Sequence, residues 1–147
     1  MKKIAVLQID SALGDTQSNL NKIDRMLGEI KDPEIRMAVF CEYGTSGYCT
    51  DQLLVARPIP GETVTALERI SRDHNIWLSG GTSEMVGDRI ANTSVMISPL
   101  KGMVAKYRKM HPFGDERDRL AMGDEPVVVD TELGRVGLTI CFDFIFP

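Results

Sequence analysis

Three residues of this sequence carry the groups that a thiol needs in order to attack a carbonyl carbon. Cys141, Glu42 and Lys109 each stand at or just beyond the end of a predicted strand. A thiol attacks as its thiolate, and a carboxylate near an ammonium group can take its proton and later return it to a leaving amine. The lysine cation and the backbone N–H of Phe142 would stabilise the negative charge that develops on the carbonyl oxygen. Together they have the groups that covalent hydrolysis of a carbonyl compound requires.

Each of these residues also has an ordinary structural interpretation. Free cysteine is among the most buried residue types, so Cys141 could belong to an inert core. Glu42 could cap or hydrogen-bond its own loop, and Lys109 could be one more solvated cation beside Arg108. Residue type and spacing alone leave both interpretations open.

The elements predicted to position these residues alternate at first and then pair as hairpins. Apolar runs predict three strands, at 4–9, 36–40 and 76–80, of which the first reads as a central strand. Amphipathic periods predict helices between Asp15 and Pro33 and from about 63 to 74. Two hairpins follow, 91–98 with 103–107 and 127–131 with 135–140. This order predicts an α/β fold with a mixed sheet, or two packed sheets, and helices outside.

Two segments near the predicted site stand out within this order. The apolar run 137–140 is expected to be a buried strand that delivers Cys141 at its end. The charged segment 108–119, between the two hairpins, is too long for a tight connection, and long loops in compact domains are often functional.

Length, charge and cysteine content narrow the class of protein. The 147 residues fit a single domain, 1–147, and 17 Lys and Arg against 21 Asp and Glu give a net charge of -4. This balance predicts no nucleic-acid partner and no membrane contact, and no apolar run could span a bilayer. The three cysteines, Cys41, Cys49 and Cys141, with two histidines predict neither a disulfide framework nor a zinc site. We therefore expect a cytoplasmic protein with reduced thiols.

Three other classes of site fit the sequence less well. A cysteine phosphatase would need an arginine soon after the thiol, and 142–147 contains none. A papain-like hydrolase would use a histidine as its base, for which His111 is the candidate. Nucleotide binding would need a glycine-rich loop, and Gly80-Gly81-Thr82-Ser83 matches neither a P-loop nor a GxGxxG motif.

Three segments of the chain resemble, in order, the signature motifs of the carbon-nitrogen hydrolase (nitrilase) superfamily. They are 39–48 around Glu42, 107–116 around Lys109, and 137–147 around Cys141. The resemblance covers essentially the whole chain. It implies the family's four-layer αββα sandwich, which we expect to be incomplete here because family domains continue well past the cysteine motif.

The resemblance also implies roles for the site residues. Cys141 is the expected nucleophile, Glu42 the general base and Lys109 the oxyanion stabiliser. Family members commonly carry a second glutamate in the loop beyond the lysine, and Glu116 is the best match. Proline usually precedes the first glutamate, where this chain has Cys41. The chemistry that the resemblance implies needs no cofactor and no metal.

The residues after the nucleophile narrow the expected substrate. Phe142-Asp143 resembles the amidase-type branches more than true nitrilases, in which a glutamate is usual. The expected function is hydrolysis of a small-molecule amide through a cysteine thioester, releasing ammonia or an amine and a carboxylate, by a homo-oligomer. The alternative is a catalytically silent, truncated subunit that acts only through protein association. We expect the 147-residue chain alone to be aggregation-prone or oligomeric, because Phe142, Phe144, Ile145 and Phe146 would be left partly uncovered. We also expect it to be essentially inactive, because Cys141 lies about six residues from the C-terminus, where the turn that carries the thiol is not held in place.

The motif around Cys141 predicts which thiol is reactive. Exposure to an amide substrate or an electrophilic analogue should place a covalent adduct on Cys141, because this thiol is the one expected to lie beside a base. Peptide mapping by mass spectrometry locates the adduct. Preferential labelling of Cys41 or Cys49, with Cys141 unmodified, would contradict the assignment.

Overall fold

The computed structural model describes residues 2–48 and 55–146 of the chain. Its elements in chain order are β1 (Lys3–Leu7), α1 (Thr16–Glu29), β2 (Ile35–Phe40), α2 (Glu62–His74), β3 (Trp77–Val86), β4 (Arg89–Ser98), β5 (Gly102–Arg108), α3 (Glu116–Arg119), β6 (Val127–Thr131), β7 (Gly134–Leu138) and the 3-10 helix η2 (Cys141–Ile145). Cys49, one of the three cysteines considered above, lies outside the described residues.

A five-stranded mixed sheet forms the centre of the molecule. Its strand order is β1-β2-β3-β4-β5, with β1, β2 and β3 parallel and β3, β4 and β5 antiparallel. The strands β6 and β7 form a separate antiparallel pair. The predicted mixed sheet is confirmed, but β1 lies at the edge of the sheet and not at its centre.

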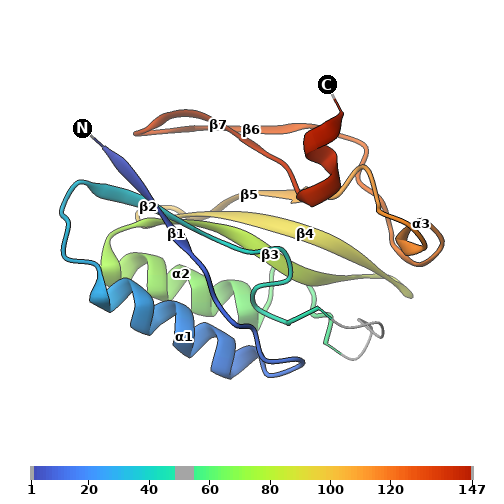
Figure 1. Ribbon diagram of the computed structural model, residues 1–147, viewed down its shortest axis with the longest axis horizontal. Coiled ribbons are helices and arrows are strands. Elements are labelled where there is room, and N and C mark those ends of the chain that lie inside the picture. Colours follow the sequence, from blue (N-terminus) through green and yellow to red (C-terminus); the bar gives the residue numbers. More distant parts are fainter. Residues whose placement is uncertain (1, 49–54, 147) are drawn as a thin grey trace.

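Two helices cover one face of this sheet, and the β6–β7 pair faces the other (Figure 1). Asp15 caps α1 by accepting a hydrogen bond from the Ser18 backbone N–H at 2.9 Å. Three- and four-residue spacing then places apolar side chains of both helices against the sheet, as the sequence predicts. These side chains are Leu20, Ile23 and Leu27 from α1 and Val64, Leu67 and Ile70 from α2.

The apolar core lies in two main parts, one on each face of the large sheet. The larger part fills the space between the helices and the sheet. The smaller part lies between the sheet and the β6–β7 pair and contains Met37, Met96, Tyr107, Leu138 and Ile140. Within the described residues the layers are therefore helix, sheet and sheet, which are three of the four layers expected for the αββα sandwich.

The segment that leads to Cys141 differs from the prediction. The strand β7 ends at Leu138, and Cys141 is the first residue of η2 with a φ of +47°. A residue with positive φ cannot continue a β-strand, so the prediction of a buried strand running into the cysteine is wrong. Because β7 pairs only with β6, most of its residues are exposed or half-buried.

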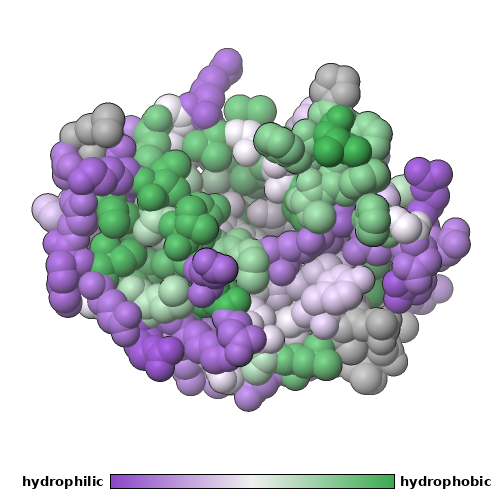
Figure 2. Space-filling model, in the orientation of Figure 1, coloured by the Kyte–Doolittle hydropathy of each residue, from purple (hydrophilic) through white to green (hydrophobic). Residues whose placement is uncertain are grey.

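Apolar side chains gather on the surface over η2 (Figure 2). Phe144, Ile145 and Phe146 are exposed by 85%, 64% and 41%, which makes them the main apolar residues of this part of the surface. A contiguous exposed apolar surface of this kind is typical of a contact region. None of the helices in the described residues is both long enough and apolar enough to cross a membrane.

Gly81 lets the loop after β2 lie directly on β3. Its N–H donates to the Cys41 carbonyl oxygen at 3.1 Å, and its carbonyl oxygen accepts from the Thr45 N–H at 3.2 Å. A Cβ atom at this position would lie 2.4 Å from the Tyr43 nitrogen and 2.7 Å from the Glu42 Cα atom. The absence of a side chain at residue 81 thus sets how closely the Glu42 loop approaches the sheet.

Adding one methyl group at residue 81 should displace this loop. We expect Gly81→Ala to lower the free energy of unfolding by about 1–3 kcal/mol, because the new Cβ meets backbone that must shift. The matched control is Gly28→Ala in α1, where a Cβ would make only an ordinary 3.8 Å contact with His74. That variant should be more stable by up to about 1 kcal/mol. Chemical denaturation of both variants checks the prediction, and equal effects would contradict it.

Candidate active site

Glu42 stands in a tight loop directly after β2. The Gly44 N–H donates to the Cys41 carbonyl oxygen at 3.0 Å, and Tyr43 has a φ of +55°. Side-chain hydrogen bonds tie the loop to β3, with 2.8 Å between the Thr45 and Thr82 hydroxyl oxygens and 2.9 Å between those of Ser46 and Ser83. The loop is therefore held by the sheet although Cys41 replaces the proline usual in the resembled family.

Lys109 follows β5 directly and is a buried cation with only 2% of its surface exposed. Its Nζ donates to the Glu42 Oε1 at 2.9 Å and to the Glu116 Oε2 at 2.9 Å. Burial lowers the pKa of Lys109, but the bonds to Glu116 and Glu42 outweigh it, so that its net pKa is raised. The lysine therefore keeps its positive charge at neutral pH.

Glu116 is the first residue of α3 and is also buried. Besides the Lys109 ammonium, its Oε2 accepts the Phe113 backbone N–H at 2.9 Å. The short helix α3 interrupts the segment predicted as a charged loop and brings this carboxylate back toward the end of β5. The structure thus brings Glu116 together with Glu42 and Lys109.

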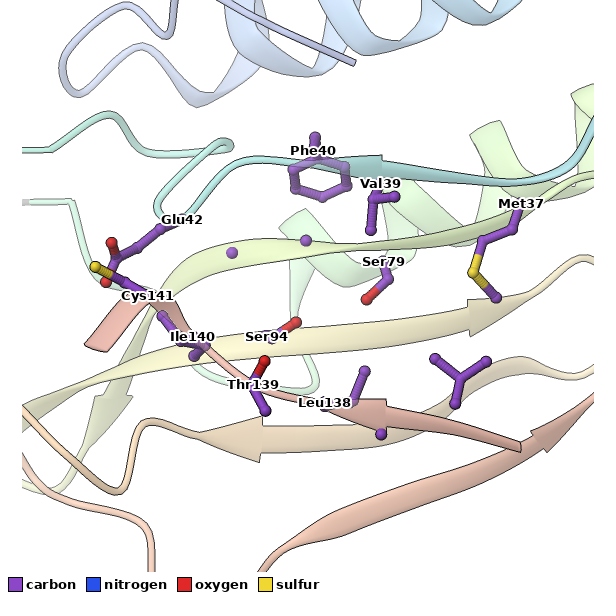
Figure 3. A pocket seen from close by; sticks show the side chains of 14 residues that line it. Met37, Val39, Phe40, Glu42, Ser79, Ser94, Leu138, Thr139, Ile140 and Cys141 are labelled. Carbon is purple, nitrogen blue, oxygen red and sulfur yellow. The ribbon is translucent and has the colours of Figure 1, made fainter. Parts of the chain in front are cut away.

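Cys141 lies beside Glu42 at one end of a pocket of about 270 Å³ between the large sheet and β7. Figure 3 shows the Cys141 sulfur directed toward the Glu42 carboxylate. Burial of the sulfur, the negative charge of Glu42 and a hydrogen bond to it raise the pKa of the Cys141 thiol, with the Lys109 charge as a partial offset. The resting thiol is therefore protonated at neutral pH, and it needs a base in order to react.

Asp143 holds the turn that presents Cys141, and the sequence analysis assigned it no such part. Its buried carboxylate accepts the Ile140 N–H at 3.0 Å, the Tyr107 hydroxyl at 2.7 Å and the His111 backbone N–H at 2.8 Å. Although burial raises the pKa of Asp143, the bonds from Tyr107, Ile140 and His111 lower it overall. A short carboxylate two residues beyond a nucleophile is the sequence signal that could have indicated this role.

His111, the candidate base of a papain-like site, is engaged elsewhere. Its Nδ1 lies 2.9 Å from the Asp143 Oδ1, and its ring stacks on Phe146 with centroids 4.0 Å apart. Phe142, whose backbone N–H is the expected second oxyanion donor, packs its ring against Phe113 and Phe146. The side chain beside the Cys141 thiol is therefore the Glu42 carboxylate and not the imidazole.

Comparison with known proteins identifies the family. A sequence model of the family described as "Carbon-nitrogen hydrolase" matches residues 3–147. The chain belongs to the carbon-nitrogen hydrolase family. Among the described residues of this carbon-nitrogen hydrolase chain, no group of three His, Cys, Asp or Glu side chains is arranged to hold a metal ion.

Relatives of this carbon-nitrogen hydrolase chain include nitrilases and amidases. It is 32% identical over 153 residues to "Nitrilase" of Pyrococcus abyssi, covering 100% of this chain and 58% of that protein. It is 31% identical over 147 residues to "(R)-stereoselective amidase" of a Pseudomonas species, covering 99% of this chain and 53% of that protein. The crystal structure of Saccharomyces cerevisiae Nit3, a member of branch 10 of the nitrilase superfamily, matches with a TM-score of 0.87 at 28% identity, covering 99% and 57%. The chain thus spans about half the length of the relatives it matches.

A third buried carboxylate, besides Glu116 and Asp143, binds the strand residues next to Lys109, and the sequence analysis made no prediction for it. Glu84 on β3 accepts hydrogen bonds from Arg108 at 2.8 Å twice and from Thr93 at 2.8 Å, and it pairs with Lys106. Burial raises the pKa of Glu84, but these partners outweigh it and lower the pKa to about 2. Two cations spaced two residues apart on β5 share one face of the strand, which is the signal that could have indicated a carboxylate opposite them.

Removal of the Glu84 charge should cost stability in a pH-dependent way. We expect Glu84→Gln to lower the free energy of unfolding at pH 7 by on the order of 3 kcal/mol, because it leaves two cations without their counter-charge. Because the pKa of Glu84 is depressed in the folded protein, the stabilisation by its carboxylate is fully present above the usual pKa of 4.5. This stabilisation is lost as the pH falls from there through about 2. The difference from the unmodified protein should therefore be constant above about pH 5 and should shrink as the pH falls from there toward about 2 in denaturation measurements.

Glu29→Gln, at an exposed helical position, is the matched control for this comparison. It should change the free energy of unfolding by no more than about 0.5 kcal/mol at any pH. A Glu84→Gln deficit that stays constant over the pH range would contradict the assignment of the depressed pKa.

Proposed function

We propose that this chain carries the catalytic residues of an amidase that hydrolyses a small-molecule amide through a cysteine thioester. The observation that carries the proposal is the buried Lys109 ammonium, which is bonded to both Glu42 and Glu116 beside the Cys141 thiol. A fixed cation and a carboxylate next to a protonated thiol supply the three functions that acyl transfer requires.

The reaction begins with removal of the thiol proton. Glu42 takes the proton from Cys141, and the thiolate attacks the amide carbonyl carbon. The negative charge then develops on the carbonyl oxygen, where the Lys109 ammonium and the backbone N–H of Phe142 are its donors. Glu116 keeps Lys109 in place as a second counter-charge from the opposite side.

Glu42 then returns its proton to the leaving nitrogen, the carbon–nitrogen bond breaks, and ammonia or an amine departs. The acyl group remains on Cys141 as a thioester. Glu42 next takes a proton from water as the water oxygen attacks the thioester carbon. The carbon–sulfur bond then breaks, the carboxylic acid product departs, and Glu42 returns the proton to the sulfur, which regenerates the thiol and the carboxylate. These steps balance without a metal or a cofactor.

Amides are preferred to nitriles in this proposal because Phe142-Asp143 follows the nucleophile, as in the amidase-type branches. The relatives carry both names, "Nitrilase" in Pyrococcus abyssi and "(R)-stereoselective amidase" in a Pseudomonas species. We further propose a cytoplasmic homo-oligomer, supported by the exposed apolar side chains of η2 and by the free thiols of Cys41 and Cys141. The alternative remains a silent subunit that acts through association alone.

The proposal is tested by measuring the turnover of a panel of amides. The assay uses the protein expressed from its whole natural reading frame. Glu42→Gln removes the base and Lys109→Ala removes the cation, so each should lower kcat by on the order of a hundredfold or more. The double variant should be little worse than either, because the residues act as one unit.

Lys101→Ala, in the exposed β4–β5 turn, is the matched control and should keep normal turnover. Full activity in Glu42→Gln would count decisively against the mechanism. No turnover of any amide by the unmodified protein, with Cys141 unreactive toward electrophiles, would favour the silent subunit.

A further inference from the structure

Asn92 is a buried residue of β4 that contacts both halves of the site. Its Nδ2 donates to the Glu42 Oε1 at 2.6 Å, and its backbone carbonyl oxygen accepts the Lys109 N–H at 2.9 Å. Only 1% of its surface is exposed. One residue of the sheet thus fixes the base through its side chain and the cation through its backbone.

The other end of the Asn92 side chain is unsatisfied. Among the described residues, its Oδ1 is the one buried side-chain polar atom without a hydrogen-bond partner. Rotating the amide would not relieve this, because Oδ1 would then face the Glu42 Oε1 at the same short distance. Asparagine is also depleted in strands, and an unpaired buried carbonyl oxygen destabilises the folded state. Strand stability therefore does not account for this residue type.

We propose that Asn92 is a positioning residue for the base of the reaction. With the Lys109 ammonium, it holds the Glu42 Oε1 and leaves Oε2 as the oxygen that takes the proton from the Cys141 thiol. The inference rests on the proposed function. Within the described residues, the bonds from Asn92 and Lys109 both end on Oε1, and the Cys141 sulfur is directed toward the same carboxylate (Figure 3).

Two donors on one oxygen hold the carboxylate more firmly than one. A single bond from Lys109 would still let the Glu42 carboxylate rotate about its own axis. The second bond from Asn92 restricts this rotation, so that the free oxygen stays directed at the sulfur.

Two titratable groups that face Glu42, namely Tyr43 and Lys109, hold their protonation state over the neutral range. Burial, with the charges of Glu116 and Glu42, raises the pKa of Tyr43, so its hydroxyl stays neutral. Lys109 stays charged because its bonds to Glu116 and Glu42 outweigh burial and raise its pKa. Glu116 accepts its bond from Lys109, whereas the Asn92 amide donates to Glu42, so a change of this side chain acts on Glu42.

The test measures alkylation of the Cys141 thiol by iodoacetamide as a function of pH, with peptide mapping to separate it from Cys41. In Asn92→Ala the rate at neutral pH should fall by about tenfold, the effect of losing one hydrogen bond to a charged group. The melting temperature should stay the same or rise, because an unsatisfied buried oxygen is removed.

A double-mutant comparison separates positioning from a structural effect. In the Glu42→Gln background, Asn92→Ala should cause no further loss, since the group that Asn92 positions is already gone. Ser98→Ala, at a buried hydroxyl on the same strand that accepts the Leu100 and Lys101 N–H groups, is the matched control. It should lower stability and leave the alkylation profile unchanged. Asn92→Leu, which keeps the volume without a donor, should behave as Asn92→Ala does.

Alkylation requires no amide turnover, so the outcomes separate the two proposals. If Glu42→Gln slows alkylation and neither residue 92 variant does, the inference about Asn92 fails and the assigned base survives. If the Asn92 effect is present but no amide is hydrolysed, the inference stands and the proposed substrate is wrong. If both variants at residue 92 slow alkylation equally with and without Glu42, Asn92 is merely structural.

Discussion

The architecture of the site depends on one requirement, that a buried ammonium group must have counter-charges. Lys109 is nearly inaccessible to water, and an unpaired cation there would destabilise the fold by several kcal/mol. Its two carboxylate partners come from opposite directions in the sequence, Glu42 67 residues before it and Glu116 seven residues after it. The loop after β2 and the short helix α3 must therefore both reach the end of β5 before the cation is stable.

The antiparallel part of the sheet makes this meeting possible. Opposite Lys109 and Arg108, β4 presents Asn92 and Thr93, which bind Glu42 and Glu84 respectively. Asn92 and Thr93 are neighbours on β4, so their side chains point to opposite faces of the sheet. A shift of register by one residue would turn each side chain to the face opposite its present one. The same hydrogen bonds that pair β4 with β5 therefore set the positions of Glu42 and Lys109.

Cys141 is positioned in a different way. Cys141 has a positive φ, which is uncommon for a residue with a side chain, and the turn around it is held by the Asp143 carboxylate. The bond from the Tyr107 hydroxyl to Asp143 links this turn to β5, one strand residue before Arg108. Contacts with β4 and β5 thus position Glu42, Lys109 and Cys141, although these residues come from three distant parts of the chain.

The sequence by itself determined the order of elements, the apolar faces of α1 and α2, and the candidate residues Cys141, Glu42, Lys109 and Glu116. Those features depend on periodicity, caps and residue chemistry, which are local. Only the tertiary structure decided that β3 runs on through Gly80 and Gly81, that β1 is an edge strand, and that Cys141 begins a 3-10 helix. It also decided which hydrogen bonds the side chains of Asn92, Glu84 and Asp143 make. Contacts between residues far apart in sequence follow from strand register and from the need to neutralise buried charge. Neither can be predicted from the residues next to a given position in the sequence.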